Sequence, residues 1–257
     1  GGMITMDDGT FTQITGNSIT YTGGLIVKGQ GYSPSTILTG IYQNGNVPGY
    51  TSIFNVAGNE ITIQDMKIDL GDGDDDFDYG IQTSTSSSIT DLTVKNNWML
   101  FATSPNSGTT QYLLDLNEGD DYTITNNLFE NATSNISVSS NSVTNLDFSN
   151  NLVRDYGVAD GGTGATVGGN AILADGPLAN SSISSNTFLN SGSYPGQMNF
   201  EFGANLTDVD ITCNIFQNSE VMYFGSIPSI FTNIDVSQNL FDNASAGSRG
   251  AVSLSTS

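Results

Sequence analysis

The amino-acid sequence predicts an all-β chain that winds into a parallel β-helix with three strands per coil. Three observations lead to this fold class. One short phrase recurs along the chain with an asparagine at a fixed place, and the residues on both sides of that asparagine alternate between apolar and polar. A further strand-like segment occupies every interval between two copies of the phrase. No helical pattern accompanies these segments, so repetition of the phrase indicates coils stacked on one another.

The repeated phrase is clearest at 206–218 (LTDVDITCNIFQN) and 231–243 (FTNIDVSQNLFDN). Its asparagine recurs at differences of 24 to 35 in residue number. The six positions are Asn97, Asn127, Asn151, Asn186, Asn214 and Asn239. One period earlier, ITIQDMKI at 61–68 fits the phrase with Met66 in the asparagine column, and GGLIVKGQGY at 23–32 reads as a looser first coil. A period of this length is typical of solenoid architectures.

Each copy of the phrase predicts two short strands joined by a bend at the asparagine. Val209 and Ile211 illustrate the two-residue alternation of a strand with one buried face. Asparagine tolerates a left-handed backbone and bonds nearby amides, so it marks the bend. We expect its side chain to bond the backbone of its own bend and the asparagine one coil away. The column is therefore predicted to be a structural ladder.

A third strand is predicted in every coil. The segments are 80–85, 112–117, 135–140, 171–176, 199–204 and 221–226. Each is expected to supply an inward apolar residue: Ile81, Leu114, Ile136, Ile172, Phe200 and Met222. A second inward residue lies three positions before each ladder asparagine. It follows the inward residue of the third strand by 10 to 14 residues in every coil. Equivalent strands of successive coils are then expected to pair in parallel, about 4.8 Å apart.

The asparagine column, with Phe or another apolar residue two positions later, resembles the asparagine ladder of right-handed parallel β-helix proteins of the pectate-lyase-like superfamily. The segment 23–40, GGLIVKGQGYSPSTILTG, is similar to the opening coil of that family. The resemblance extends over about residues 19–243. It implies a right-handed helix of about seven to eight coils, in agreement with the crossover rule. It implies no single activity, because the superfamily includes polysaccharide lyases, glycoside hydrolases, phage tailspikes and non-catalytic surface proteins.

The chain is expected to form one domain over residues 1–257. Residues 1–22 are expected to be an N-terminal cap or the first strands, and residues 244–257 a flexible or partner-contacting tail. Because a β-helix exposes strand edges at its ends, a homo-oligomer or a neighbouring domain is expected to make contact there.

Charge and composition limit the partners. The chain has 26 acidic and five basic residues, a net charge of −21, so it cannot form the basic patch that a nucleic-acid partner needs. No apolar run approaches the roughly 18–20 residues of a membrane span, so no membrane insertion is expected. Abundant Gly, Ser, Thr and Asn with almost no Lys favour an extracellular, cell-surface or virion location.

The chain contains no histidine, which excludes Ser-His-Asp chemistry and a histidine base. Its single cysteine, Cys213, can form no intrachain disulfide and is expected to be a small buried apolar residue.

Candidate catalytic carboxylates lie on the outward face of the third strand. The longest connections emerge beside this strand, and in the enzymes that the chain resembles this edge borders the substrate cleft. Asp175 and Glu201 fall on adjacent coils, offset by two positions, so their carboxyls are expected to be roughly 6–9 Å apart, which suits an inverting glycosidase. Asp115 lies two or three coils away. Ordinary solvated polar residues on a sheet are the alternative interpretation.

Candidate substrate-binding residues lie nearby. Tyr156, Tyr194 and Tyr223 offer aromatic faces for sugar stacking, and Asn117 and Arg154 offer polar contacts. Resemblance to polysaccharide lyases would require an Arg or Lys base, for which Arg154 is the nearest candidate. The segment EGDDY at 118–122 resembles the Gly-Asp-Asp motif of polygalacturonase-like enzymes, but their histidine and Arg-Ile-Lys motifs are missing.

The densest acidic stretch, DLGDGDDDFDYG at 69–80, predicts a Ca²⁺ loop, because hard cations prefer several carboxylate oxygens. The candidate ligands are Asp72, Asp74, Asp76 and Asp78. A plain solvated acidic loop remains the alternative.

Two classes of function stay open. The first is a non-catalytic surface module, adhesin-like or tailspike-like, that acts in adhesion, structure or binding of a carbohydrate or other cell-surface ligand. The second is a polysaccharide depolymerase that uses the outward carboxylates, with an inverting glycoside hydrolase favoured over a lyase.

Overall fold

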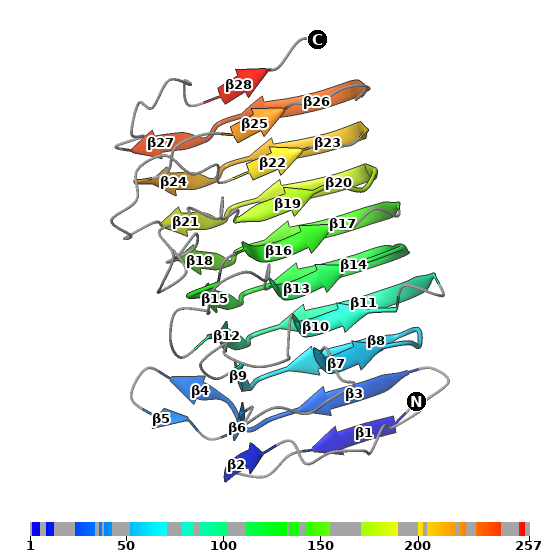
Figure 1. The fold of residues 1–257 in the computed structure, drawn as a ribbon, viewed down its shortest axis with the longest axis vertical. Helices are drawn as coiled ribbons and strands as arrows, with labels where there is room; N and C mark the ends of the chain where they lie inside the picture. The colour runs from blue at the N-terminus through cyan, green and yellow to red at the C-terminus, as the bar shows by residue number, and fades with distance from the viewer. Residues whose placement is uncertain are drawn as a thin grey trace, which may run out of the picture.

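The chain folds into a parallel β-helix whose strands form three stacked sheets (Figure 1). The computed structural model describes residues 2–5, 9–12, 24–33, 36–37, 39–42, 52–70, 79–84, 88–101, 112–132, 134–138, 142–154, 171–189, 200–202, 205–218, 222–224, 230–242 and 252–254. None of these residues belongs to a helix, so the described part contains no helix that could cross a membrane.

The sheets are named here by their order along a coil. Sheet I has nine strands: β1 (Gly2–Thr5), β3 (Leu25–Lys28), β8 (Ile61–Gln64), β11 (Ile89–Lys95), β14 (Gly119–Thr125), β17 (Val143–Ser149), β20 (Leu178–Ser184), β23 (Leu206–Thr212) and β26 (Phe231–Ser237). Sheet II follows the asparagine bend: β2 (Gly9–Thr12), β6 (Thr39–Tyr42), β9 (Lys67–Asp69), β12 (Trp98–Leu100), β15 (Leu128–Glu130), β18 (Leu152–Arg154), β21 (Thr187–Leu189), β24 (Ile215–Gln217) and β27 (Leu240–Asp242).

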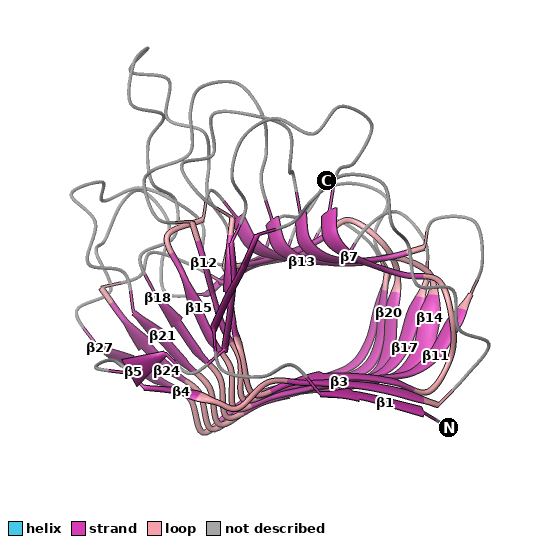
Figure 2. Ribbon diagram, turned by 90° about the horizontal axis from the view of Figure 1, so that it is seen from below, coloured by secondary structure: helices cyan, strands magenta, loops and turns pink. Residues whose placement is uncertain are grey.

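Sheet III holds the six predicted third strands: β10 (Tyr79–Thr83), β13 (Tyr112–Leu116), β16 (Ser134–Val138), β19 (Ile172–Ala174), β22 (Phe200–Phe202) and β25 (Met222–Phe224). Two strands that were not predicted extend it at its ends, β7 (Ser52–Val56) and β28 (Val252–Leu254). A small antiparallel pair, β4 (Tyr32–Ser33) and β5 (Thr36–Ile37), stands apart from the three sheets. Viewed along the axis, the three sheets form the sides of each coil (Figure 2). The prediction of an all-β fold with three parallel strands per coil is confirmed.

The register of sheet III is the one expected from the sequence. Ile81 pairs with Leu114, Leu114 with Ile136, and Ile136 with Ile172. The same column continues through Phe200 to Met222. The described side chains of this column are almost wholly buried, so the strands stack with like positions over one another.

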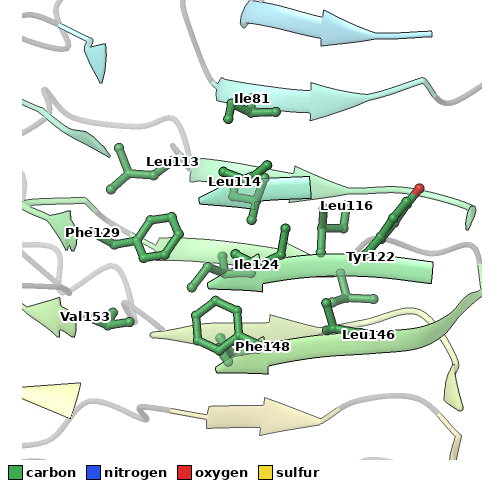
Figure 3. Packing of buried hydrophobic residues seen from close by; sticks show 14 of the residues in the cluster. Ile81, Leu113, Leu114, Leu116, Tyr122, Ile124, Phe129, Leu146, Phe148 and Val153 are labelled. Carbon is green, nitrogen blue, oxygen red and sulfur yellow. The ribbon is translucent and has the colours of Figure 1, made fainter. Parts of the chain in front are cut away.

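Aliphatic and aromatic residues stack into inner columns that fill the helix (Figure 3). On sheet II, the residue two after the asparagine is aromatic in several coils, and Phe188, Phe216 and Phe241 stack with ring centroids 5.1 and 4.9 Å apart. On sheet I, Ile124, Phe148 and Ile183 lie in one register column, each with 0% exposure. Burial of these columns is the main apolar contribution to folding.

The predicted asparagine ladder is present and buried. The backbone N–H of Asn127 donates to Asn151 Oδ1 at 2.9 Å, and its Nδ2 donates to the same oxygen at 3.1 Å. Nδ2 of Asn127 also donates to the carbonyl of Val94 in the preceding coil, at 2.9 Å. The same pattern recurs at Asn97, Asn151, Asn186 and Asn214. Met66 begins the column, and its N–H donates to Asn97 Oδ1 at 3.2 Å.

The residue before each ladder position has a left-handed backbone. The set with φ between 55° and 62° is Asp65, Asn96, Asn126, Asn150, Ser185, Cys213 and Gln238. This geometry corrects the expectation that Cys213 is buried: its φ is 57° and its side chain is exposed, because the bend turns this position outward. A second left-handed column crosses sheet I at Asp91, Asp121, Asn145, Asn180, Asp208 and Asn233. Asn and Asp dominate both columns because they tolerate this conformation.

In one coil, a glycine replaces the aliphatic residue of one inner column, and a tyrosine replaces the leucine of the adjacent inner column. Gly119 aligns with Ile89 and Val143, while Tyr122 aligns with Leu92 and Leu146. A Cβ at Gly119 would overlap the ring of Tyr122 and would press on the carbonyl of Ile89. The Tyr122 hydroxyl, buried in the core, donates to the carbonyl of Glu118 at 3.1 Å. The glycine therefore makes room for the tyrosine.

Gly119→Ala is expected to lower the free energy of unfolding by about 1–3 kcal/mol through overpacking, and Tyr122→Leu by a similar amount through a cavity. The double variant is expected to lose at least about 1 kcal/mol less than the two single variants added together, because the methyl group of the alanine then occupies space that the Tyr122 ring has left. Urea unfolding followed by circular dichroism measures all four proteins. Strictly additive losses would contradict this account of the pair.

Asn151→Ala is expected to lower the free energy of unfolding by about 3 kcal/mol, because it removes the acceptor of the buried Asn127 N–H, one of the acceptors of Asn127 Nδ2, and the side-chain donor to the carbonyl of Ile124. Asn239→Ala is the matched control at the half-buried end of the ladder, where the expected loss is about 1 kcal/mol. If urea unfolding gave the same loss of free energy for Asn151→Ala and Asn239→Ala, burial would not explain how much the ladder hydrogen bonds stabilise the fold.

Candidate functional site

One register column of sheet III, next to the inner column of Ile81 and Leu114, carries mostly polar residue types. In register order it contains Asn55, Gln82, Asp115, Ser137, Leu173, Glu201 and Tyr223. Both Asp115 and Glu201, two of the predicted catalytic residues, therefore belong to one column, separated by two intervening strands. The column changes from coil to coil, unlike the inner columns.

Asp115 is a buried carboxylate held by neutral amides. It is 3% exposed, and its Oδ2 accepts from Gln82 Nε2 at 3.1 Å and from Asn117 Nδ2 at 3.2 Å. Asn117 is fixed in turn, because its N–H donates to Thr83 Oγ1 at 2.7 Å and its Nδ2 to the carbonyl of Thr83 at 2.8 Å. These contacts fix the position of the Asp115 carboxylate on the sheet.

Two tyrosines that the sequence analysis did not identify lie at the start of the same strands. Tyr79 and Tyr112 are aligned on β10 and β13, and their rings stack with centroids 6.0 Å apart and an interplanar angle of 6°. Both side chains are half-buried. The signal in the sequence is their position, because each follows a long connection and aligns with the other one coil away. They form the aromatic part of the site.

The Tyr112 hydroxyl is held in its neutral form. Burial raises the pKa of Tyr112 above its usual value, and the negative charges of Asp115 and Asp175 raise that pKa further. Both carboxylates therefore disfavour ionisation of the Tyr112 phenol.

Asp175 directly follows β19 and is exposed, and its N–H donates to the carbonyl of Val138 at 3.0 Å. Glu201 pairs with Leu173, two positions before Asp175, so the backbone offset matches the expectation. The carboxyl separation of roughly 6–9 Å stays a prediction.

The remaining predicted residues fall in different places. Tyr223 aligns with Glu201 on the neighbouring strand. Tyr156 and Tyr194 lie outside the described residues, as do the four predicted Ca²⁺ ligands Asp72, Asp74, Asp76 and Asp78. Within the described ranges, no three His, Cys, Asp or Glu side chains form a group that could hold a metal ion.

Arg154 belongs to a charged and aromatic network on the outward face of sheet II. Its Nη2 donates to Glu130 Oε1 at 2.8 Å, and Glu130 Oε2 accepts from Trp98 Nε1 at 3.0 Å. Lys67 Nζ lies 4.9 Å from the centroid of the Trp98 ring and 2.7 Å from Asp69 Oδ2. Two of the five basic residues are thus engaged in ion pairs on this face.

Comparisons of the chain with protein-family models, with curated proteins and with solved structures gave no significant match. The parallel β-helix is therefore established by the structure alone, and the function has to be argued from the geometry of its outward faces.

Alkaline titration tests the environment of Tyr112. Burial, the first cause, also raises the pKa of Tyr122 to about 12. We expect Tyr112 and Tyr122 to ionise later than free tyrosine when absorbance at the phenolate band is followed upward from about pH 9. Folding favours the neutral phenols of Tyr112 and Tyr122. Their contribution to the free energy of unfolding is therefore complete below about pH 10, the usual pKa of tyrosine, and is lost as the pH rises through their raised pKa values.

Tyr112→Phe is expected to remove one late-ionising group. Asp175→Asn is expected to shift the remaining late titration of Tyr112 to lower pH, whereas Asp210→Asn, an exposed aspartate on sheet I, leaves it unchanged. If Asp175→Asn and the wild type had the same titration curve, the charge of Asp175 would have no effect on the pKa of Tyr112.

Proposed function

We propose that the chain is a non-catalytic surface module of the extracellular space, the cell surface or a virion, and that it binds a glycan along the outward face of sheet III. The observation that carries this proposal is the stacked, half-buried pair Tyr79–Tyr112 on the two strands that also hold Gln82 and Asp115. Binding sites for small molecules combine aromatic surface with a few polar groups of fixed orientation. Gln82 and Asn117 give the Asp115 carboxylate that fixed orientation.

The chemistry of the chain supports binding more than turnover. There is no histidine, and Arg154, the nearest candidate for a lyase base, is paired with Glu130 on sheet II. A guanidinium held by a carboxylate keeps its proton and is a poor base. Asp115, which is buried and held by two amide donors, orders the surface of its strand and does not itself contact a ligand in this proposal.

A depolymerase is the second candidate, and the register of β19 and β22 favours it. Leu173 pairs with Glu201, and Asp175 follows Leu173 by two residues, an offset compatible with the roughly 6–9 Å between carboxyls that an inverting glycosidase needs. In this proposal Asp175 and Glu201 act as the acid and the base of an inverting hydrolase. A Ca²⁺ ion at Asp72, Asp74, Asp76 and Asp78 would hold the acidic segment in either case.

Contacts through the end of the helix are part of the proposal. Phe231 at the last strand of sheet I is 37% exposed, whereas Leu206, its register partner one coil earlier, is 0% exposed. Leu240 of β27 is 57% exposed. Among the described strands, β26 and β27 are the last of their sheets, and their exposed apolar side chains support contact with a second copy or with a neighbouring domain.

Pull-down on immobilised polysaccharides, combined with assays for released reducing ends and for ultraviolet-absorbing unsaturated products, tests both candidates. We expect retention on at least one polysaccharide and no release of either product. Release that disappears in a folded Glu201→Gln variant would replace the binding module by the hydrolase. Retention on none of a panel of neutral, amino and acidic polysaccharides would contradict glycan binding.

A further inference from the structure

The last coil that the structure describes leaves its inner columns open to solvent. On sheet I, Ile234 and Val236 of β26 align with Val209 and Ile211 of β23. Val209 and Ile211 are 0% exposed, whereas Ile234 and Val236 are only partly buried. The four side chains are similar in size, and the inner residues of β23 differ from those of β26 in having a further coil over them. The added exposure at β26 is therefore surface that one more coil would cover.

Sheet II ends in the same way, because β27 is its last strand (Figure 1). Phe216 of β24 is 3% exposed and stacks on Phe241 of β27, with ring centroids 4.9 Å apart. Phe241 packs against the core and is only partly buried. The end of the helix thus presents an aliphatic part on β26 and an aromatic part on β27, and both belong to columns that run through the chain.

The asparagine ladder ends at the same place. At Asn214, both the backbone N–H and Nδ2 donate to Asn239 Oδ1, at 2.9 and 3.1 Å. Nδ2 of Asn239 donates to the carbonyl of Ile211 at 2.7 Å. Among the residues that the structure describes, none accepts a hydrogen bond from the backbone N–H of Asn239. The acceptor that the ladder places there in earlier coils is the side-chain oxygen of the next asparagine.

Negative charge on the rim of this end restricts what can cover it. Asp235 and Asp242 are exposed on β26 and β27, and Asp235 aligns with Asp210, a second exposed aspartate. A third acidic residue in that column would add repulsion, since like charges on paired strands are destabilising. Gln217 shows the alternative, because it donates to Asp242 at 3.1 Å from the coil before. A coil with amide, hydroxyl or basic side chains at these two places fits the rim.

The first coil of a second copy lacks the acceptor that this end requires. In the register of sheet II, Gly9 aligns with Thr39, which holds the ladder position one coil before Met66. Glycine has no side-chain oxygen. A second copy that stacked its first coil on β27 would therefore leave the N–H of Asn239 without a ladder acceptor.

We propose that the end formed by β26 and β27 is a docking surface for one coil of another parallel β-helix, in which an asparagine continues the ladder. The Oδ1 of that asparagine would accept from the N–H and Nδ2 of Asn239, and a large apolar residue two positions later would stack on Phe241. A strand of the partner would pair with β26 and cover Ile234 and Val236. Contact of coil on coil holds this chain together at every step, so the partner continues an interface already present. This assignment rests on the end contact proposed above and names the partner.

Adding a coil to the complete chain tests this surface without changing any residue of the chain. One extension repeats residues 228–254 after Ser257, and the other repeats residues 203–227, so that each added strand follows β28 by the interval that separates β25 from β26. The first supplies a copy of Asn239 and the second a copy of Asn214. We expect hydrogen exchange at the original Asn239 N–H, resolved by NMR, to slow at least about tenfold in both extended chains, because a buried acceptor then holds it.

Substitutions confined to the added coil separate the ladder acceptor from simple coverage. Asn239→Ala in the added copy of residues 228–254 is expected to remove most of the added protection of the original Asn239 N–H, while amides of the original β26 stay protected. Thr232→Ala in the added copy is the matched control, since Thr232 and its register partner Thr207 are both exposed. We expect this control to leave the protection of Asn239 intact.

Each outcome decides a separate point. Unchanged exchange at Asn239 in both extended chains would overturn the docking surface. Full protection of Asn239 despite Asn239→Ala in the added coil would overturn the asparagine as the feature that defines the partner. Self-association of the unextended chain in sedimentation equilibrium, with protection of Asn239 that rises with concentration, would make a second copy the occupant and overturn the inference. Retention of the unextended chain on polysaccharides is measured separately and decides glycan binding whichever of these results is obtained.

Discussion

The structure depends on the hydrogen bonds between successive asparagine bends, in which the N–H donors of one ladder asparagine are accepted by the side-chain oxygen of the asparagine in the following coil. At the corner between sheets I and II, the backbone N–H of Asn127 and its Nδ2 both reach Asn151 Oδ1. These groups are buried, and a buried donor without an acceptor costs about 1–3 kcal/mol, so a coil cannot slide relative to its neighbour without losing several such bonds. The ladder therefore fixes the register of the strands on both sides of the bend. Stacked inner columns, such as Phe188–Phe216–Phe241, follow from that register.

A fixed register makes the interior repetitive and leaves the outward faces free to differ. Inside, a change in one column has to be matched in another, as Gly119 and Tyr122 show. Outside, neighbouring coils carry different chemistry that forms contacts across coils, as Trp98 with Glu130 and Glu130 with Arg154. A binding site on such a helix is therefore assembled from single positions on several coils. Tyr79 and Tyr112, whose rings stack between neighbouring coils, show how two such positions come together.

The features predictable from sequence are those that recur with the coil. The six asparagines and inward residues such as Ile81 and Leu114 have correct registers because period-two alternation and the 24–35 residue spacing define them together. The pairing of Glu130 with Arg154 was within reach, since each lies three residues after a ladder asparagine. The Tyr79–Tyr112 stack was not, because ring orientation at the start of a strand depends on packing and not on periodicity. Cys213 was misplaced because its burial was judged from its chemistry and not from the left-handed bend that it occupies.

Parallel stacking also explains how the chain tolerates so few basic residues. Equivalent positions lie one above the other, so a carboxylate meets the residue at the same place in the coil before or after it. In several columns that residue is a neutral donor: Asn96 donates to Asp65, Asn145 to Asp121, Asn233 to Asp208, Gln82 to Asp115 and Gln217 to Asp242. An amide satisfies a carboxylate oxygen without cancelling its charge. The outward faces are therefore ordered by hydrogen bonds while the negative potential persists.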